Sequence, residues 1–288
     1  MIPQSWVETQ VFSMNVKELK HALGRQRLRL DRAQIVAYLM ALMSQQLLLR
    51  HYKFVHSQAS CGVGYAGFMK GLELVAPLWS VLEKRFREQN HIVFDLQTIV
   101  DSSLLPSKED KSITQKDWNC GFATARKSKS KSLTPEKTYI CGEKVLTFIN
   151  SKHQIVFSQL MPSINSSDEN VFKHPMVWAS RGLRNGVLLV DRAFSNKSAR
   201  QGIDFLNKNL SGYCLKIISP PKHKQIWVLS AEEKALYQKR WAIEEVFRQL
   251  KDPFGLYRMI LKGVRRKGLR EARVAIATLA WNWRLSNP

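Results

Sequence analysis

Three acidic residues have the spacing and the neighbours of groups that hold divalent metal ions. Asp101 follows the β-branched run TIV and Asp191 follows the apolar run LLV, so each is expected where a strand ends. Glu244 is expected on a helix, in the segment YQKRWAIEEVFRQLK that covers residues 237–251. Carboxylates that meet at one sheet edge repel each other, and two metal ions that relieve this repulsion can also cut or join a phosphodiester. Phosphodiester chemistry is therefore the first hypothesis.

The helix around Glu244 is predicted to carry one polar stripe. At about 100° per residue, five polar side chains fall on one side of the helix, and Glu245 falls outside them. The polar stripe consists of Tyr237, Arg240, Glu244, Arg248 and Lys251, and the apolar stripe beside it consists of Ile243, Val246, Phe247 and Leu250. A glutamate with basic neighbours on its own face can bind a metal while those neighbours hold phosphate oxygens. Glu244, and not Glu245, is thus the predicted third acid.

Each of these residues also has a purely structural interpretation. An aspartate at a strand end commonly begins a turn or caps a helix. Arg240 and Glu244 have the i, i+4 spacing of an exposed ion pair on a helix. The structural interpretation weakens only if all three acids come together in space.

The order of the expected elements would bring the two aspartates side by side. The sequence predicts a strand at residues 91–106 and a hairpin at 138–161, followed by a helix at 171–185 and a strand at 186–190. A helix after Ser195, a strand at 212–218 and a helix after Ser230 complete the order. This order resembles the ribonuclease H-like fold, an α/β fold with a mixed five-stranded sheet flanked by helices. Its first and fourth strands are parallel neighbours at the centre of the sheet. Asp101 and Asp191 would therefore meet at the carboxyl edge, where ligands of α/β folds bind.

The charge of the chain indicates a polyanionic partner. Its 288 residues include 45 Lys and Arg against 23 Asp and Glu, a formal net charge of +22. The basic residues are spread from end to end, whereas attachment to an anionic membrane commonly uses one basic amphipathic helix. No segment has the pattern of a signal peptide or a membrane span, and the four cysteines lack the spacing of a zinc site. Nucleic acid is the predicted partner, in a cytoplasmic protein without a membrane partner.

Residues 1–88 are predicted to form a small helical N-terminal domain, and residues 89–288 the α/β domain. Asp31 is expected to cap a helix whose apolar residues recur at three and four. The basic residues around its start are Lys17, Lys20, Arg25, Arg27, Arg29 and Arg32. One interpretation is DNA binding; the other is a packed helical layer with a solvated basic edge, because no helix-turn-helix spacing stands out. The Ser- and Lys-rich residues 116–137 are likewise either a DNA clamp or a solvated linker.

Four fixed positions in the segment 237–251 match a family signature. The pattern Y-x2-R-x3-E-x6-K, which begins at Tyr237 and ends at Lys251, resembles the Y-R-E-K signature of DDE transposases from bacterial insertion sequences. TIVDSSLLP and LLVDRAFSN resemble the strands of that family that carry its first two acids. YICGEKVLTFIN resembles its Gly-x-Lys strand. The resemblance covers about residues 90–285 and includes no part of the N-terminal helices.

The resemblance implies a reaction, a cofactor and partners. In that family three acids, here Asp101, Asp191 and Glu244, bind two magnesium ions, for which manganese can substitute. The residues expected to contact DNA phosphates are Tyr237, Arg240, Arg248 and Lys251. Lys144 is expected either to contact the DNA backbone or, in its structural interpretation, to be an exposed lysine on a strand. The implied enzyme is a DNA transposase that cuts double-stranded DNA at the terminal inverted repeats of its element and joins the ends to target DNA. It is expected to act as a homodimer on DNA, at the nucleoid of a bacterium.

Two other functions fit the same residues. A structure-selective nuclease of the same fold would cut DNA without joining the ends to a target. A non-catalytic DNA-binding protein would keep the charge and use the acids only structurally. The presence of all three acids together with Tyr237, Arg240 and Lys251 favours catalysis.

Overall fold

The computed structural model describes residues 2–23, 30–48, 65–106, 120–124, 137–161, 168, 171–194, 197–220, 229–256 and 267–288. They group into two compact units. One consists of residues 1–92 together with 248–288, and the other of residues 93–247. The predicted division at residues 88 and 89 concerns functional domains, and it stays a prediction.

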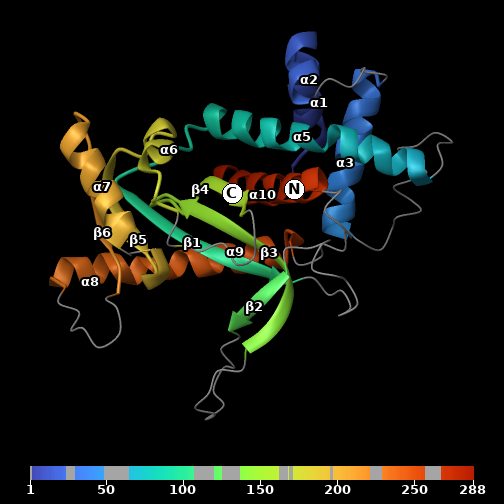
Figure 1. Cartoon of the computed structure of the whole chain (residues 1–288). Helices are drawn as coiled ribbons and strands as arrows, with labels where there is room; N and C mark the ends of the chain where they lie inside the picture. The colour runs from blue at the N-terminus through green and yellow to red at the C-terminus, as the bar shows by residue number, and fades with distance from the viewer. Residues whose placement is uncertain are drawn as a thin grey trace. The chain divides into compact units, whose positions relative to one another are not determined.

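A mixed sheet forms the centre of the unit 93–247 (Figure 1). Its strands are β1 (Gln97–Pro106), β2 (Cys120–Thr124), β3 (Lys137–Ile149), β4 (Ile155–Leu160), β5 (Asn185–Val190) and β6 (Cys214–Ile218). Strand β1 lies between β3, to which it is antiparallel, and β5, to which it is parallel. Strand β6 continues the sheet parallel to β5, and β4 pairs antiparallel with β3. The five predicted strands are all present in this order and direction, which confirms the ribonuclease H-like fold.

Two features of the sheet differ from the prediction. Strand β2 lies within the Ser- and Lys-rich residues 116–137 and pairs with the outer part of β3, residues 137–141. The rest of that segment up to residue 136 lies outside the described residues. Strand β1 continues to Pro106 against β3, as predicted for residues 91–106, and the expectation that it ends at Asp101 is wrong. What ends at this point is the parallel pairing with β5, whose last pair is Val100 and Val190.

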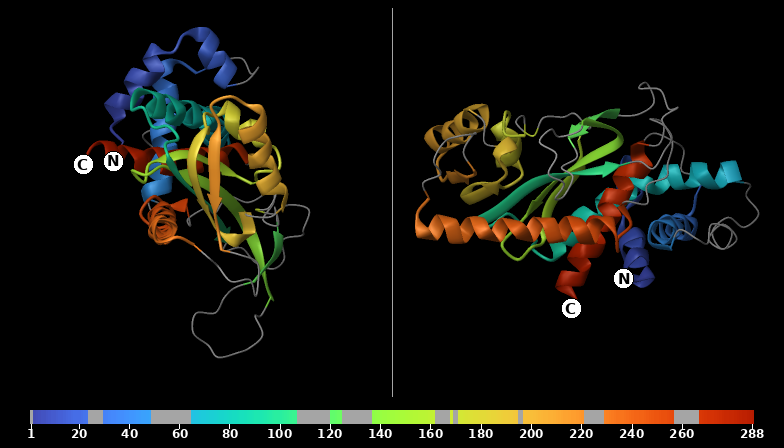
Figure 2. Two further views of the ribbon diagram at one scale, coloured as in Figure 1. Left: turned by 90° about the vertical axis from the view of Figure 1, so that its left-hand side faces the viewer. Right: turned by 90° about the horizontal axis from the view of Figure 1, so that it is seen from below.

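Helices cover the sheet on both sides. The helices of this unit are α6 (Pro175–Ser180), α7 (Lys197–Asn209), α8 (Ala231–Gln238) and the start of α9 (Ala242–Lys251), with a 3-10 turn (Lys239–Trp241) between the last two. Helix α7 lies on one side of the sheet and α8 with the start of α9 on the other (Figure 2). Helix α8 begins at a capping box, in which the Ser230 side chain accepts from the Glu233 amide and the Glu233 side chain accepts from the Ser230 amide. The helix predicted across 171–185 is shorter, because Pro175 begins α6 and positive-φ Gly182 follows its end.

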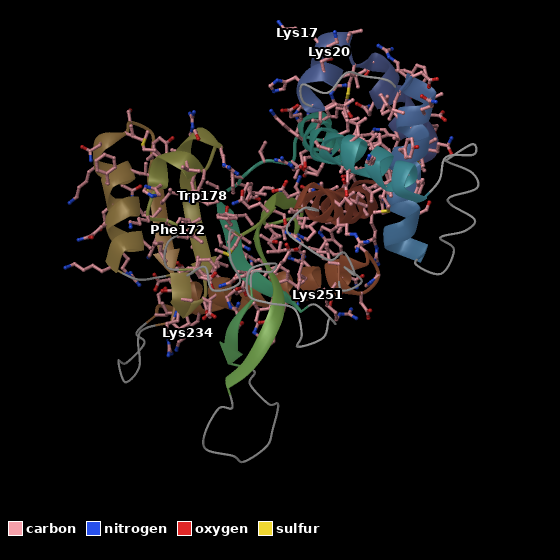
Figure 3. The ribbon with its side chains drawn as sticks, turned by 45° about the vertical axis from the view of Figure 1, so that its right-hand side comes forward. Lys17, Lys20, Phe172, Trp178, Lys234 and Lys251 are labelled. Carbon is pink, nitrogen blue, oxygen red and sulfur yellow. The ribbon has the colours of Figure 1, made fainter. Side chains whose placement is uncertain are left out.

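An aromatic cluster packs on the face of β3 and β4 near α6. Trp178 stacks on Phe148 with ring centroids 4.3 Å apart, and Phe172 lies beside it (Figure 3). The Trp178 indole donates a hydrogen bond to the carbonyl of Val171 at 2.7 Å. Because this indole donates a hydrogen bond, the cluster anchors α6 to the sheet without leaving the buried donor unpaired.

The other unit is helical, as predicted for the N-terminal residues. Its helices are α1 (Gln4–Ser13), α2 (Val16–Ala22), α3 (Arg32–Leu48), α5 (Tyr65–Gln89) and α10 (Lys267–Ser286). The Asp31 side chain accepts from the Gln34 amide at 2.8 Å, which confirms the predicted cap of α3. Lys17 and Lys20 are exposed on α2 (Figure 3), whereas Arg25, Arg27 and Arg29 lie outside the described residues. Within the described part of the chain, none of the helices has the length and apolarity that a bilayer crossing requires.

Candidate active site

The register between β1 and β5 places the first two acids. The parallel pairing ends at Val100 and Val190, and the next residue on each strand is an aspartate. Gly186 fixes where this pairing starts, because its φ is +107° and a Cβ there would lie 2.2 Å from the Leu96 carbonyl oxygen. The amide of the following residue donates to the same carbonyl at 2.9 Å. Asp101 and Asp191 therefore lie at the same edge of the sheet, as predicted.

Asp101 is held in a largely buried position beside other negative charges. Its side chain is 18% exposed, and its Oδ1 accepts from the Ser102 amide at 2.7 Å. Burial raises the pKa of Asp101 to about 6; the Ser102 hydrogen bond and Arg240 oppose this, whereas Asp191 and Asp168 add to it. The ionised form of Asp101 therefore lacks full compensation, and an added cation would stabilise it.

Arg240 connects the third acid to the first. Its Nη1 donates to Asp101 Oδ2 at 3.1 Å, and its Nη2 donates to Glu244 Oε1 at 3.0 Å. The i, i+4 ion pair of the structural interpretation is thus present. A local helix pair would not, however, reach a central strand. The guanidinium brings Glu244 and Asp101 to the same place, and the charge of Asp191 acts on both Asp101 and Arg240.

The helical segment positions these groups through a change of geometry. The segment 237–251 was expected to be one α-helix, but residues 239–241 form a 3-10 turn, which twists more per residue. Tyr237 still lies beside Arg240, whose Cζ is 6.0 Å from the centre of its ring. Burial raises the pKa of Tyr237, and Asp191 and Asp101 add to this while Arg240 opposes it. Tyr237, Arg240, Asp101 and Asp191 are therefore close enough for their charges to influence one another.

The remaining helix faces agree with the predicted stripes. Ile243, Val246, Phe247 and Leu250 are buried, and Glu244, Glu245 and Arg248 are exposed. Both glutamates lie in the first turn of α9. Arg248 and Lys251 are on the last turns of α9, which group with residues 248–288. Their approach to the acids stays a prediction.

Lys144 is not the exposed strand lysine of the structural interpretation. Its Nζ lies 2.7 Å from Asp168 Oδ1, and the two side chains are 13% and 14% exposed. Asp168 also raises the pKa of Asp101, as the smallest of several influences. Asp168 is thus a fourth carboxylate near the first acid. No sequence signal marked Asp168, because it lies directly after no predicted strand and matches no motif.

Trp241 is a second residue that the sequence prediction missed. It follows Arg240 directly in the 3-10 turn, and 68% of its surface is exposed. A tryptophan among the polar residues of this segment is a signal that the sequence did contain. Its position on a polar helical segment, outside the apolar stripe, marks it as a residue that is not part of the core.

The donor set fits hard divalent cations, although the acids are not arranged around an ion. In the described part of the chain, no three side chains of His, Cys, Asp or Glu stand close enough to hold a metal ion as they are. Arg240 lies between two of the acids and provides the positive charge there. Carboxylate oxygens are the ligands that magnesium and manganese prefer. The buried, negatively charged surroundings of Asp101 therefore fit a metal once the guanidinium has moved.

Comparisons with known proteins match the chain to one family model. Residues 94–283 match the model of the family described as transposase DDE domain. No curated protein matches the chain. Among solved structures, a Mos1 transposase paired-end complex with left transposon end is 11% identical at a TM-score of 0.27, over 89% of this chain and 80% of that chain. The Mos1 strand transfer complex is 11% identical at a TM-score of 0.25, over 90% and 80%. These superpositions are too distant to support the fold, which rests on the strand order.

Proposed function

The chain belongs to the transposase DDE domain family, whose members are DNA transposases, and from this premise we propose that Asp101, Asp191 and Glu244 are its three catalytic acids. The arrangement around Arg240 supports this assignment, because it joins a strand acid and a helix acid that are far apart in sequence. The chemistry is the transfer of phosphodiester bonds.

The reaction consists of two displacements at phosphorus. In the first, a water oxygen bonds to the phosphorus at the end of the element, the bond to the 3′ oxygen breaks, and a free 3′-hydroxyl and a 5′-phosphate result. In the second, that 3′-hydroxyl oxygen bonds to a phosphorus of the target DNA and releases a target 3′-hydroxyl. No covalent bond to the enzyme forms, so no side chain needs to be a nucleophile.

The acids hold the cofactor, and the basic residues hold the phosphate. Magnesium, or manganese in its place, would neutralise charge on the attacking and leaving oxygens. Asp101, Asp191 and Glu244 would bind it through carboxylate oxygens. Arg240 and Tyr237 would contact the non-bridging phosphate oxygens and the sugar, since charge-assisted bonds from arginine to phosphate are strong and directional.

Further contacts to DNA would come from several segments. Arg248 and Lys251 would bind phosphates on either side of the reacting bond, and Lys144 would join them where its bond to Asp168 opens. The exposed indole of Trp241 offers a surface on which a base can stack. Exposed lysines of α2 would bind the duplex outside the site. We further propose that the enzyme acts as a homodimer on terminal inverted repeats and target DNA, at the nucleoid of a bacterium.

One observation carries this proposal: the bridge that Arg240 makes between Asp101 and Glu244. The test uses a duplex with the inverted repeats found in the DNA that flanks the gene, labelled at one end, and a supercoiled plasmid as target. With magnesium, the full chain should release the labelled end and join it to the plasmid. Asp101→Asn should do neither, while it binds the duplex nearly as tightly as the original chain.

Other outcomes would point away from the proposal. Cut ends that are never joined to the plasmid would indicate a nuclease. Full cleavage in a chelator would exclude the metal-dependent reaction. Unchanged cleavage by Asp101→Asn would remove the assigned acids from the chemistry.

A further inference from the structure

Arg240 makes two hydrogen bonds to carboxylate oxygens that would have to break before both carboxylates could bind a metal ion freely. Its two terminal nitrogens bind one oxygen each of Asp101 and Glu244, at 3.1 and 3.0 Å. The arginine side chain is 17% exposed, so most of its surface is covered by the groups that surround it. The guanidinium therefore lies between the acids and not beside them.

The guanidinium and a divalent ion would compete for the same negative charge. Burial lowers the pKa of Arg240, but the nearby acidic groups, Asp101 first among them, outweigh it and raise that pKa overall, so the side chain stays cationic. A carboxylate oxygen that accepts a bond from a cationic nitrogen is a weaker ligand for a metal, because its lone pair is directed at the nitrogen. Both acids are affected, since each gives one oxygen to the bridge.

The ring of Tyr237 offers the Arg240 guanidinium another contact when its bonds to the two acids break. Its Cζ is 6.0 Å from the centre of the Tyr237 ring, at the outer limit of a cation–π contact. Tyr237 and Arg240 lie at the boundary of α8 and the 3-10 turn, so rotation about the arginine side chain does not require the helix to move. The released group would remain at the site, where a phosphate could bind it.

We propose that Arg240 is a displaceable latch, which keeps the acids from binding a metal ion until its guanidinium transfers to a DNA phosphate. The inference rests on the proposed role of Asp101 and Glu244 as metal ligands. It adds that one residue exchanges partners between the resting and the loaded enzyme. Metal binding and DNA binding then favour each other. A metal ion on the acids releases the guanidinium for a DNA phosphate, and a phosphate that binds the guanidinium releases the acids for a metal ion.

The advantage of this arrangement is control over when the metal binds. A chain that bound its metals without DNA would hold an activated site in the presence of any phosphodiester. With the latch closed, a guanidinium of the same chain is bonded to both Asp101 and Glu244 and offsets part of their charge. The site becomes competent only after a duplex supplies a phosphate for Arg240.

Lysine at position 240 separates a latch from a simple charge effect. Arg240→Lys keeps the positive charge, but an ammonium is a point charge that cannot bridge two carboxylates with the planar geometry of a guanidinium. The matched control is Arg184→Lys, because Arg184 is exposed and precedes β5 at the end opposite to Asp191. Circular dichroism confirms that each variant is folded before the titration.

The experiment measures binding of Mn²⁺ to the full chain by electron paramagnetic resonance of the free ion. Without DNA, Arg240→Lys should bind Mn²⁺ about tenfold more tightly than the original chain and than Arg184→Lys, a coupling of ordinary size. A short duplex of random sequence should tighten Mn²⁺ binding to the original chain by a similar factor and should have little effect on Arg240→Lys. Asp101→Asn should lose the site in both conditions.

Two results would overturn the inference in different ways. If Arg240→Lys binds Mn²⁺ as the original chain does, with and without duplex, while Asp101→Asn loses the ion, the latch is wrong and the metal site stands. If Asp101→Asn binds Mn²⁺ as well as the original chain does, the proposed metal site is wrong and the latch falls with it.

Discussion

Arg240 and Asp101 are 139 positions apart in the chain, and their side chains meet at 3.1 Å. The bond ties the turn before α9 to the central strand of the sheet, at the edge where Asp191 also lies. Glu244 accepts a hydrogen bond from the same guanidinium. A surface ion pair within one helix would not require a contact with the central strand. The contact between Arg240 and Asp101 therefore argues for a site assembled from distant segments.

The stability of the metal-free protein should fall as Asp101 ionises. In the unfolded chain Asp101 loses its proton near its ordinary pKa of 3.8, whereas in the folded chain its pKa is about 6. Between these values the folded state holds a proton that the unfolded state has lost, so the free energy of unfolding decreases as pH rises through this window. The decrease should reach about 2–3 kcal/mol above pH 6.

Asp101→Asn isolates this effect from all other titrating groups. In a chelator, urea unfolding of the variant and of the original chain should give similar stabilities near pH 4. The variant should become the more stable of the two as pH rises to neutrality. A difference that does not change with pH would show that Asp101 titrates normally and that its surroundings are not as the structure has them.

Replacing Gly186 should disturb the register that aligns the two aspartates. Gly186→Ala forces a Cβ to within 2.2 Å of the Leu96 carbonyl oxygen at a φ of +107°. Gly182→Ala is the matched control, because its φ is +93° and nothing lies within 4 Å of the added atom. The control should lose about 1 kcal/mol from backbone strain, and Gly186→Ala at least about 2 kcal/mol more. Equal losses in urea unfolding would mean that the close approach is absent.

Removing one charge of the Lys144–Asp168 pair should lower the free energy of unfolding more than removing both charges together. Asp168→Asn leaves the Lys144 ammonium in a site where it is 13% exposed, and the free energy of unfolding should drop by about 2–3 kcal/mol. Lys144→Met should cost a similar amount alone. The double variant should recover much of the loss, because no charge remains uncompensated. Losses that simply add in a double-mutant cycle would show that the two residues do not interact.

The sequence was sufficient to predict five of the strands and the sheet edge at which Asp101 and Asp191 lie. Alternating and β-branched runs mark the strands around Asp101 and Asp191, and the helical period separates Glu244 from its neighbour. These signals are local, and the order of the elements then limits the topology to one known arrangement. The strand order and the positions of both aspartates were confirmed for this reason.

Local signals could not predict the contacts between distant segments. Asp168 belongs to no periodic pattern, and its pairing with Lys144 depends on how a loop folds back. Arg240 reaches Asp101 from a 3-10 turn that the helical period did not predict. Strand β2 was taken for part of a linker, because its short run CGFAT lies among serines and lysines and forms only by pairing with β3.

The adjacent glutamates of α9 provide the most direct test of the central claim, because one change can be made at either position. Glu244→Gln removes a carboxylate that Arg240 joins to Asp101, whereas Glu245→Gln alters an exposed residue of the same turn. With the labelled end duplex and magnesium, Glu244→Gln should slow cleavage by several orders of magnitude with the fold and duplex affinity nearly intact. Glu245→Gln should cleave at close to the original rate. Equal losses for the two variants, or a larger loss for Glu245→Gln, would contradict the assignment of Glu244 as the third acid.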